Sequence, residues 1–424
     1  MQKLAIIGGK PVIDHRFKLY NSIGRDEAKA AEKVIKSGIL SRFLGCWDKD
    51  FYGGKKVREF EEKFADYFGS EYGISVNSAT SGLIVAVGAC EVGPGDEVIV
   101  SPYTMTASAA AILAFNAIPV FADIEDRTFN LDPHAIEKRV TRNTKAIMVP
   151  NIFGHPADYR AIMKIARKHK LLVIEDNAQS PSAKYHGKYA GTIGDIGVFS
   201  LNYHKHIHTG EGGVCLTKSK FLAERMQLIR NHAEAVVEDR GVKNLVNMIG
   251  YNFRLGEIEA AIGIEQLKKL KKLVSSRIKI AERLSSMLMD IDLLEMPYVG
   301  KDCSHVYYVL PIKYKGREAS LSDVVRALNA EGVPIAGGYV KPLYLQPIYQ
   351  NKIAYGKRGC PFSCPFYNGK INYKKGICPT AEKMHNKGLL VMEMCKYDFN
   401  ELDISMIVEA FHKVFNNLEQ LKNA

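Results

Sequence analysis

The chain has 424 residues, of which 46% are hydrophobic and 25% are charged. This length exceeds what one small core can organise, so we expect a large domain and a smaller one. The balanced composition excludes a disordered or fibrous protein. Lysine and arginine outnumber aspartate and glutamate by 58 to 46, and the net charge of +12 favours anionic small molecules. We expect no nucleic-acid partner, because no nucleic-acid-binding module accompanies the charge.

Membrane association and metal binding are not expected either. No apolar run approaches the roughly 20 residues of a membrane helix, and the first residues lack the order of a signal peptide. The eight cysteines are scattered, so reduced thiols and a cytoplasmic location are predicted. Cys360, Cys364 and Cys378 lie close in sequence, but their spacing is not that of a zinc ribbon. We interpret them as free thiols in a loop.

The predicted elements begin with helical patterns. Residues 25–37 have one, residues 45–54 form a glycine-rich and aromatic loop, and residues 57–68 form an amphipathic helix that ends at Gly69. Short β-branched runs then alternate with helical runs up to about residue 220. Strands are expected at 73–76, 97–100, 119–123, 145–150, 171–175, 198–201 and 213–217, and helices at 81–90, 106–115 and 159–168.

This alternation predicts an α/β fold whose mainly parallel sheet is covered by helices on both faces. In such sheets ligands bind at the carboxyl ends of the strands. A long helix over 257–288 leads out of this region, and residues 306–312, 321–331 and 403–418 indicate a smaller C-terminal α/β domain. We therefore divide the chain into 1–285, an N-terminal arm with the large domain, and 286–424, the small domain.

Three segments carry residues suited to chemistry. In the first, residues 76–82, a strand runs into small hydroxyl residues at the start of a helix. Unpaired N–H groups and the helix dipole at such a place attract a phosphate. Serine and threonine also cap helices without binding any ligand, so both interpretations stay open at this point.

The second segment, residues 172–179, is an apolar strand that ends in carboxylates. A buried Asp176 could keep a pyridine nitrogen protonated, which makes the ring an electron sink. Gln179, one helical turn further on, could bond a phenolic oxygen. A magnesium site, a ribose site and helix capping are alternatives that this segment alone does not exclude.

The third segment, residues 198–213, places Lys205 between a strand and a glycine-rich turn. A lysine whose pKa is lowered by burial or by a nearby cation forms imines with aldehydes. His204, His206 and His208 alternate around it. We favour ring packing or polar contacts for these histidines over a metal site, because they share one extended segment with the lysine.

Taken together, these segments offer a phosphate cradle, an acid for a pyridine nitrogen and an imine-forming lysine. The chain resembles the DegT/StrS family of sugar aminotransferases, which use pyridoxal 5'-phosphate (PLP) and have PLP fold type I. The resemblance runs over most of the chain. It is carried by residues 54–65, 77–83, 95–100, 191–200, 209–213 and 250–261.

The resemblance implies a role for each matching residue. Lys205 would be the catalytic Schiff-base lysine, Asp176 would pair with the pyridine nitrogen, and Gln179 would lie near the ring oxygen. The residues that match the phosphate contacts are Ala79, Thr80, Ser81 and Ser200. Asn252 matches an asparagine that relatives supply from the neighbouring subunit, which implies a homodimer with shared active sites.

Two departures from the family pattern concern the cofactor and the substrate. Met105 stands where relatives stack an aromatic ring on PLP, and its polarizable sulfur can still cover the ring more loosely. Asn202 replaces a histidine of many relatives, while His206 stands where many have asparagine. These exchanges bear on substrate specificity.

The resemblance implies an aminotransferase that moves an amino group from glutamate or glutamine to a keto-sugar. We favour a nucleotide-linked sugar because the basic surface suits a diphosphate. Residues 4–12 resemble the start of the inosose aminotransferases, which makes a keto-cyclitol the alternative acceptor. A PLP-binding regulator without catalysis and a nucleotide-binding α/β protein also remain open, although the intact Lys205 speaks against both.

Overall fold

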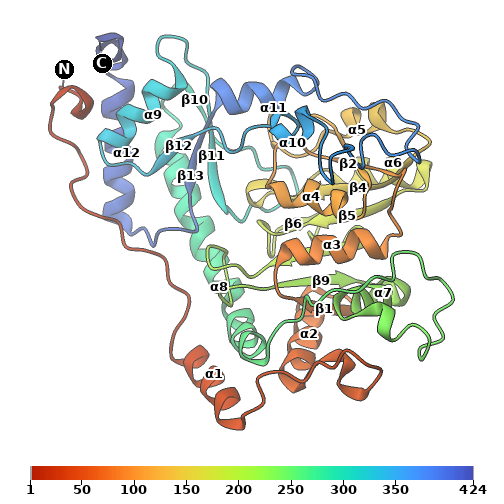
Figure 1. Cartoon of the computed structure of the whole chain (residues 1–424). Coiled ribbons are helices and arrows are strands. Elements are labelled where there is room, and N and C mark those ends of the chain that lie inside the picture. The colour runs from red at the N-terminus through yellow and green to blue at the C-terminus, as the bar shows by residue number, and fades with distance from the viewer. Residues whose placement is uncertain (1, 424) are drawn as a thin grey trace.

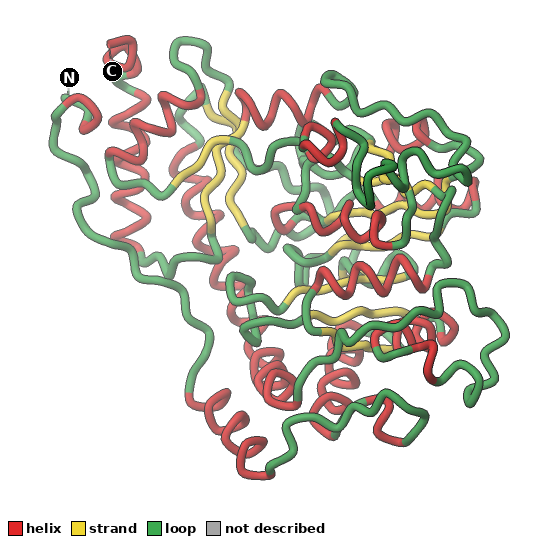
Figure 2. The backbone as a smooth tube through the Cα atoms, viewed as in Figure 1, coloured by secondary structure: helices red, strands yellow, loops and turns green. Residues whose placement is uncertain are grey.

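The computed structural model describes residues 2–423, which form two layered units connected by a long helix (Figure 1). A sheet lies at the centre of the larger unit (Figure 2). It has seven strands in the order β1-β9-β8-β5-β4-β2-β3. The strands β8, β5, β4, β2 and β3 run parallel, whereas β9 pairs antiparallel with both β1 and β8. Their bounds are β1 Tyr72–Val76, β2 Glu97–Val100, β3 Ile118–Phe121, β4 Thr144–Pro150, β5 Leu172–Asp176, β8 Ile196–Ser200 and β9 Gly213–Thr217. The mainly parallel sheet that we predicted is confirmed.

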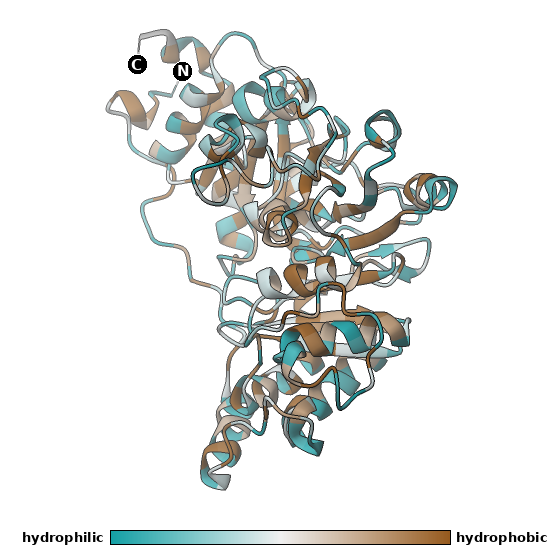
Figure 3. Ribbon diagram, turned by 45° about the vertical axis from the view of Figure 1, so that its right-hand side comes forward, coloured by the Kyte–Doolittle hydropathy of each residue, from teal (hydrophilic) through white to brown (hydrophobic). Residues whose placement is uncertain are grey.

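Helices cover both faces of this sheet. Successive residues of a strand point to opposite faces. Val98 and Val100 accordingly join the cluster packed under α3, α4 and α7, whereas Ile99 packs with α5 and α6 on the other face. With both faces covered, the strands are buried at nearly every position, and several of them are brown in Figure 3. The helix bounds are α2 Lys55–Phe68, α3 Ala79–Ala89, α4 Thr106–Ala114, α5 Pro133–Arg139, α6 Tyr159–His169 and α7 Lys220–Arg230.

The first and the longest helices agree with the predictions from periodicity. Helix α1 spans Arg25–Ser37, and α8 spans Glu257–Leu288. The expected loop at 45–54 contains a 3-10 turn at Lys49–Tyr52, which the Asp48 side chain caps. Helices α5 and α7 were not predicted, nor was the small hairpin of β6 (Lys184–Tyr185) and β7 (Lys188–Tyr189). Within residues 2–423, no helix combines the length and apolar character needed to cross a bilayer.

Helix α8 joins the two units. Its first half packs against α2 and the large sheet, and its second half enters the core of the smaller unit. That unit has a sheet of order β10-β11-β13-β12 in which every pairing is antiparallel. Its elements are β10 Leu294–Glu295, β11 Val309–Tyr314, β12 Ile335–Gly337, β13 Leu389–Glu393, α9 Leu321–Ala330, α10 Pro347–Gln350, α11 Pro379–Lys383 and α12 Glu401–Phe415.

Two segments pack across the boundary that we placed at residue 285. Leu4 and Ile13, near the N-terminus, belong to the core of the smaller unit, and the two chain ends lie close together (Figure 1). In the opposite direction, Tyr344, Tyr349 and Tyr373 pack against the large sheet around Phe121. Because segments on each side of residue 285 pack with the opposite unit, the division into 1–285 and 286–424 stays a prediction.

A buried ion pair anchors the N-terminal segment. Glu331 is fully buried, lies 2.8 Å from the Lys413 ammonium, and accepts the backbone N–H groups of Ala5 and Val12. Replacing Glu331 with alanine leaves a buried ammonium without its charge partner, so we expect a loss of about 3–5 kcal/mol in the free energy of unfolding. Denaturant unfolding measures this loss. The exposed pair of Glu32 with Lys36 provides the control, since Glu32→Ala should cost less than about 1 kcal/mol.

Candidate active site

The predicted catalytic residues surround a cavity of about 390 Å³. It lies at the carboxyl ends of parallel strands, where such sheets bind ligands. Asn151 follows β4, Asp176 ends β5, Ser200 ends β8, and Lys205 follows in the next turn. The fold thus brings together motifs that are far apart in the sequence.

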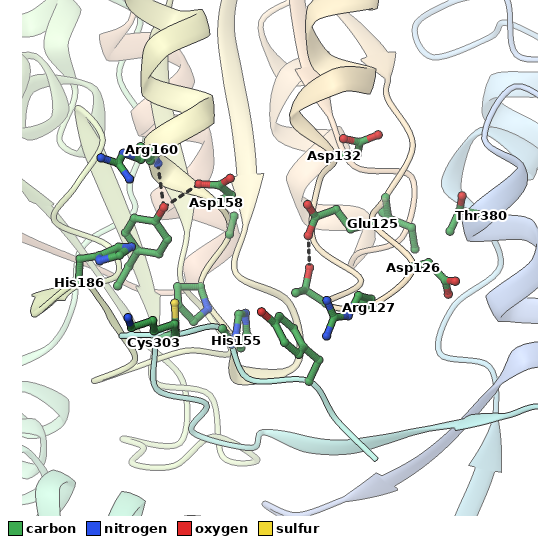
Figure 4. A pocket seen from close by; sticks show the side chains of 18 residues that line it. Glu125, Asp126, Arg127, Asp132, His155, Asp158, Arg160, His186, Cys303 and Thr380 are labelled. Atoms are coloured by element: carbon green, nitrogen blue, oxygen red, sulfur yellow. Dashed lines mark hydrogen bonds between the residues drawn. The ribbon is translucent and has the colours of Figure 1, made fainter. Parts of the chain in front are cut away.

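A larger cavity of about 740 Å³ lies elsewhere, between the loop after β3, the start of α6 and residues 298–303 (Figure 4). Two of its carboxylates accept hydrogen bonds within the protein, Glu125 from the Thr128 hydroxyl and Asp158 from the Tyr185 hydroxyl. The lysine that lines it, Lys301, is exposed. Although this cavity is larger, the smaller one has the residues for amine chemistry.

Lys205 is buried, with 8% of its surface exposed. Its backbone N–H donates to the Asn202 carbonyl at 2.9 Å, and its Nζ lies 4.3 Å from the centre of the Tyr308 ring. Burial lowers the pKa of Lys205 to about 8, against the opposing effects of Cys395 and Asp176. More of the Lys205 side chains are therefore the neutral amine, the form that attacks a carbonyl, than for a lysine with an ordinary pKa.

Asp176 is buried on the same cavity, with 7% of its surface exposed. The Ser108 hydroxyl donates to it at 2.7 Å and the Ala178 N–H at 3.2 Å. Burial raises the pKa of this carboxyl, while Ser108, Ala178 and the charge of Lys205 act to lower it. A cationic N–H donor placed in the cavity would favour the carboxylate form further.

The start of α3 forms another wall of the cavity. Ala79 and Thr80 line it together with Ser78, which caps the helix by accepting the Ser81 N–H at 3.1 Å. Ser81 itself does not line the cavity, because its hydroxyl donates inward to Asn77 at 2.6 Å. A Cβ at Gly213 would come within 2.8 Å of the Ala79 nitrogen, so only glycine lets β9 approach this turn.

The other predicted cofactor residues differ in their positions. Met105 lines the cavity and is 55% exposed, and Ser200 lines it at the end of β8. Asn202 also lines it; its Nδ2 donates to Glu211 at 2.8 Å, while its Oδ1 is buried without a hydrogen-bond partner among residues 2–423. Asn252 is exposed and does not line this cavity.

Gln179 has both ends of its side-chain amide engaged. Its Nε2 donates to the Tyr339 hydroxyl and its Oε1 accepts the Phe153 N–H, each at 2.8 Å. Gln179 and Tyr339 both line the cavity. Their hydrogen bond therefore connects the large sheet to the smaller unit at the site.

Two of the histidines next to Lys205 make contacts within the protein. His206 is buried, its Nε2 bonds the Val306 carbonyl at 2.8 Å, and burial lowers its pKa to about 3. The Nδ1 of His208 accepts the Gly210 N–H at 3.3 Å. Both rings therefore make polar contacts, as the sequence indicated, whereas His204 lines the cavity.

Sequence reasoning did not identify three further residues that line the cavity: Tyr308, Tyr339 and Glu393. Glu393 ends β13, Tyr308 directly precedes β11, and Tyr339 is the second residue after β12. No motif marks them in the sequence. Only the packing of the two units brings them to Lys205.

The comparison with solved structures defines the class of protein. The X-ray structure of an aminotransferase from Psychrobacter cryohalolentis has a TM-score of 0.80 and 28% sequence identity to this chain, and the match covers 95% of this chain and 100% of that one. The fold is that of the PLP-dependent aminotransferases of fold type I.

The sequence comparisons define the family. The model of the DegT/DnrJ/EryC1/StrS aminotransferase family matches residues 25–389, and the chain belongs to this family. GDP-perosamine synthase of Caulobacter vibrioides is 34% identical over 312 residues, which are 73% of this chain and 83% of that protein. The L-glutamine:2-deoxy-scyllo-inosose aminotransferase of Streptoalloteichus tenebrarius is 33% identical over 359 residues, which are 82% of this chain and 83% of that protein. The protein is a PLP-dependent aminotransferase.

The residues present fit PLP. The cavity volume is in the range of small-molecule sites, and the N-terminus of α3 at one wall suits the phosphate. Buried Asp176 suits the pyridine nitrogen, and the partially neutral Lys205 suits the aldehyde. The unpaired Oδ1 of Asn202 leaves an acceptor for a further polar group.

The lowered pKa of Lys205 predicts how cofactor loading depends on pH. With a pKa of about 8, about one tenth of the side chains are neutral at pH 7 and about nine tenths at pH 9. The rate at which PLP attaches to the apoprotein should therefore rise about tenfold between these values and then level off. The growth of the visible absorption band after addition of PLP measures this rate. A lysine with an ordinary pKa would show a continued rise above pH 10.

Proposed function

We propose that the enzyme transfers an amino group from glutamate or glutamine to the ketone of a sugar, and that this sugar is nucleotide-linked. The observation that carries the proposal is buried Lys205, which faces a cavity shared with Asp176, Tyr308 and Glu393. Hydroxyl, carboxylate and aromatic groups of this kind suit a polyhydroxylated ring. The net charge of +12 suits a diphosphate, and GDP-perosamine synthase is a relative whose name gives a nucleotide-linked product.

PLP, when bound, supplies the electron sink that stabilises a carbanion. In our proposal, Lys205 attaches the cofactor and afterwards moves a proton between carbon atoms. Asp176 holds the pyridine nitrogen protonated, and Gln179 lies near the ring oxygen. The phosphate would be held at the cavity by Ala79, Thr80 and Ser200, with Ser81 directly behind them in the first turn of α3. Met105 would cover one face of the ring, and Asn202 would lie beside it.

We also propose a homodimer in which Asn252 of the partner subunit completes the phosphate site. Asn252 lies outside the cavity of its own chain. Leu245, Val246 and Ile249, close to it in sequence, are large apolar side chains that are at least half exposed. Such residues suggest a surface that a partner covers. Sedimentation equilibrium should give the mass of two chains, and Asn252→Asp should weaken PLP binding through repulsion of the phosphate.

The cytoplasm is the proposed location. All eight cysteines are free thiols, which suits a reducing compartment. Fractionation of cells that produce the protein tests this location.

The inosose aminotransferase activity is the second candidate. The Streptoalloteichus relative is named for that reaction and spans a larger share of this chain than the perosamine synthase. An inosose carries no phosphate, so the carboxylates of Glu211 and Glu393 at the cavity would not repel it.

A panel of acceptors distinguishes the two candidates. The PLP-loaded enzyme is mixed with glutamate or glutamine and with either GDP-4-keto-6-deoxymannose, UDP-N-acetyl-3-dehydro-glucosamine or 2-deoxy-scyllo-inosose. Mass spectrometry then detects the aminated product. Amination of a nucleotide-linked ketone supports the proposal, and amination of the inosose alone supports the alternative. A protein that binds PLP but responds to neither donor would be the non-catalytic regulator.

A further inference from the structure

His204 lies where two cavities meet. It lines the cavity of Lys205 and also an adjoining one of about 540 Å³, together with Tyr308 and Glu393. We infer that His204 and Glu393 bind hydroxyl groups of the amino acceptor and so determine which ketone reaches Lys205. This inference rests on the proposed function and assigns a specificity role to the residue that directly precedes the lysine.

The packing around Tyr308 gives His204 its position. The His204 ring lies 6.1 Å from the Tyr308 ring and meets the Tyr203 ring edge-on at 5.1 Å. Tyr308 also carries the Lys205 ammonium over its face, 4.3 Å from the ring centre. The imidazole and the amine are therefore held against the same aromatic ring, and an acceptor that contacts His204 has its ring close to Lys205.

The polar atoms of His204 and Glu393 are available to a ligand. Among residues 2–423, neither ring nitrogen of His204 has a hydrogen-bond partner. Glu393 faces Lys396 at 3.4 Å, and its side chain remains more than half exposed. Partial burial and the charge of Lys205 lower the pKa of His204, against Glu393 and Glu211. A neutral imidazole offers one N–H donor and one acceptor nitrogen. A hydroxyl group, which both donates and accepts, can bond to either of them.

The charges favour the hydroxyl-bearing ring of the acceptor over the donor as the ligand of His204 and Glu393. Glutamate carries two carboxylates, which Glu393 at the junction and Glu211 in the Lys205 cavity would repel. Hydroxyl groups, in contrast, donate hydrogen bonds to carboxylates. The pair should therefore affect the half-reaction with the ketone and leave the half-reaction with the donor unchanged.

The experiment separates the two half-reactions. In His204→Phe the ring remains but its polar atoms are lost, whereas His204→Gln keeps a donor and an acceptor. We expect the donor half-reaction, measured as the absorbance change of PLP-loaded enzyme on mixing with glutamate, to stay within about twofold in both variants. For the acceptor that the wild-type enzyme aminates, kcat/KM should fall about tenfold in His204→Phe, mainly through KM, and recover in His204→Gln. His208→Gln, a histidine of the same segment outside the cavity, is the matched control.

The possible outcomes are distinct. An unchanged kcat/KM in His204→Phe would overturn the inference alone. A parallel fall in the donor half-reaction would also overturn it, because the ring would then support Lys205 rather than the acceptor. If the wild-type enzyme aminates no ketone of the panel, the proposed function fails and the inference fails with it.

Discussion

Replacing Lys205 with alanine is expected to reduce turnover at least about 1000-fold, since the variant lacks both the amine that attaches PLP and the group that moves the proton. The side chain is buried and its ammonium lies over the Tyr308 ring, so we expect no surface lysine to take its place. Steady-state amination and the visible spectrum of the PLP-treated protein measure the effect. The variant should fold normally, because the removed charge is one that burial already disfavours.

Two further variants support the interpretation of this result. Lys205→Arg keeps the positive charge but has no amine that forms the covalent link, so it should be as inactive as the alanine variant. Lys218→Ala changes an exposed lysine and should retain full activity. A Lys205→Ala variant that turns over at the wild-type rate would show that another residue carries the cofactor.

The second large effect is expected at Asp176. Asp176→Asn keeps the size and the bond to Ser108 but removes the negative charge that would hold the pyridine nitrogen protonated. We expect kcat to fall about 100–1000-fold with little change in fold, as for the loss of a preorganised charge at a reacting group. Single-turnover mixing with glutamate measures the loss directly.

Ser108→Ala provides the graded comparison. It removes the hydroxyl that donates to Asp176 at 2.7 Å and leaves the carboxylate in place, so activity should fall much less than in Asp176→Asn. Equal losses in the two variants would mean that the position of the carboxyl group, and not its charge, supports catalysis.

The predictions from periodicity were most accurate for long elements. Helices α1 and α8 have the expected bounds, because a repeat of apolar residues over three or more turns has no other regular explanation. The hairpin β6–β7 and the strand β12 were not predicted, since two or three residues carry no periodic pattern. Helix α5 was missed for a similar reason, because it has seven residues.

The candidate site was predictable where its residues belong to short motifs at the ends of predicted strands. Asp176 ends β5, and Ala79 and Lys205 follow β1 and β8 within five residues. Strands that run in the same direction in one sheet end at a common edge, so the sequence by itself determined that these residues meet. The placement of Tyr308, Tyr339 and Glu393 was decided by tertiary structure alone. These side chains belong to the smaller unit, and they reach Lys205 only because α8 and the buried core around it hold the two units together, a long-range contact that no local pattern encodes.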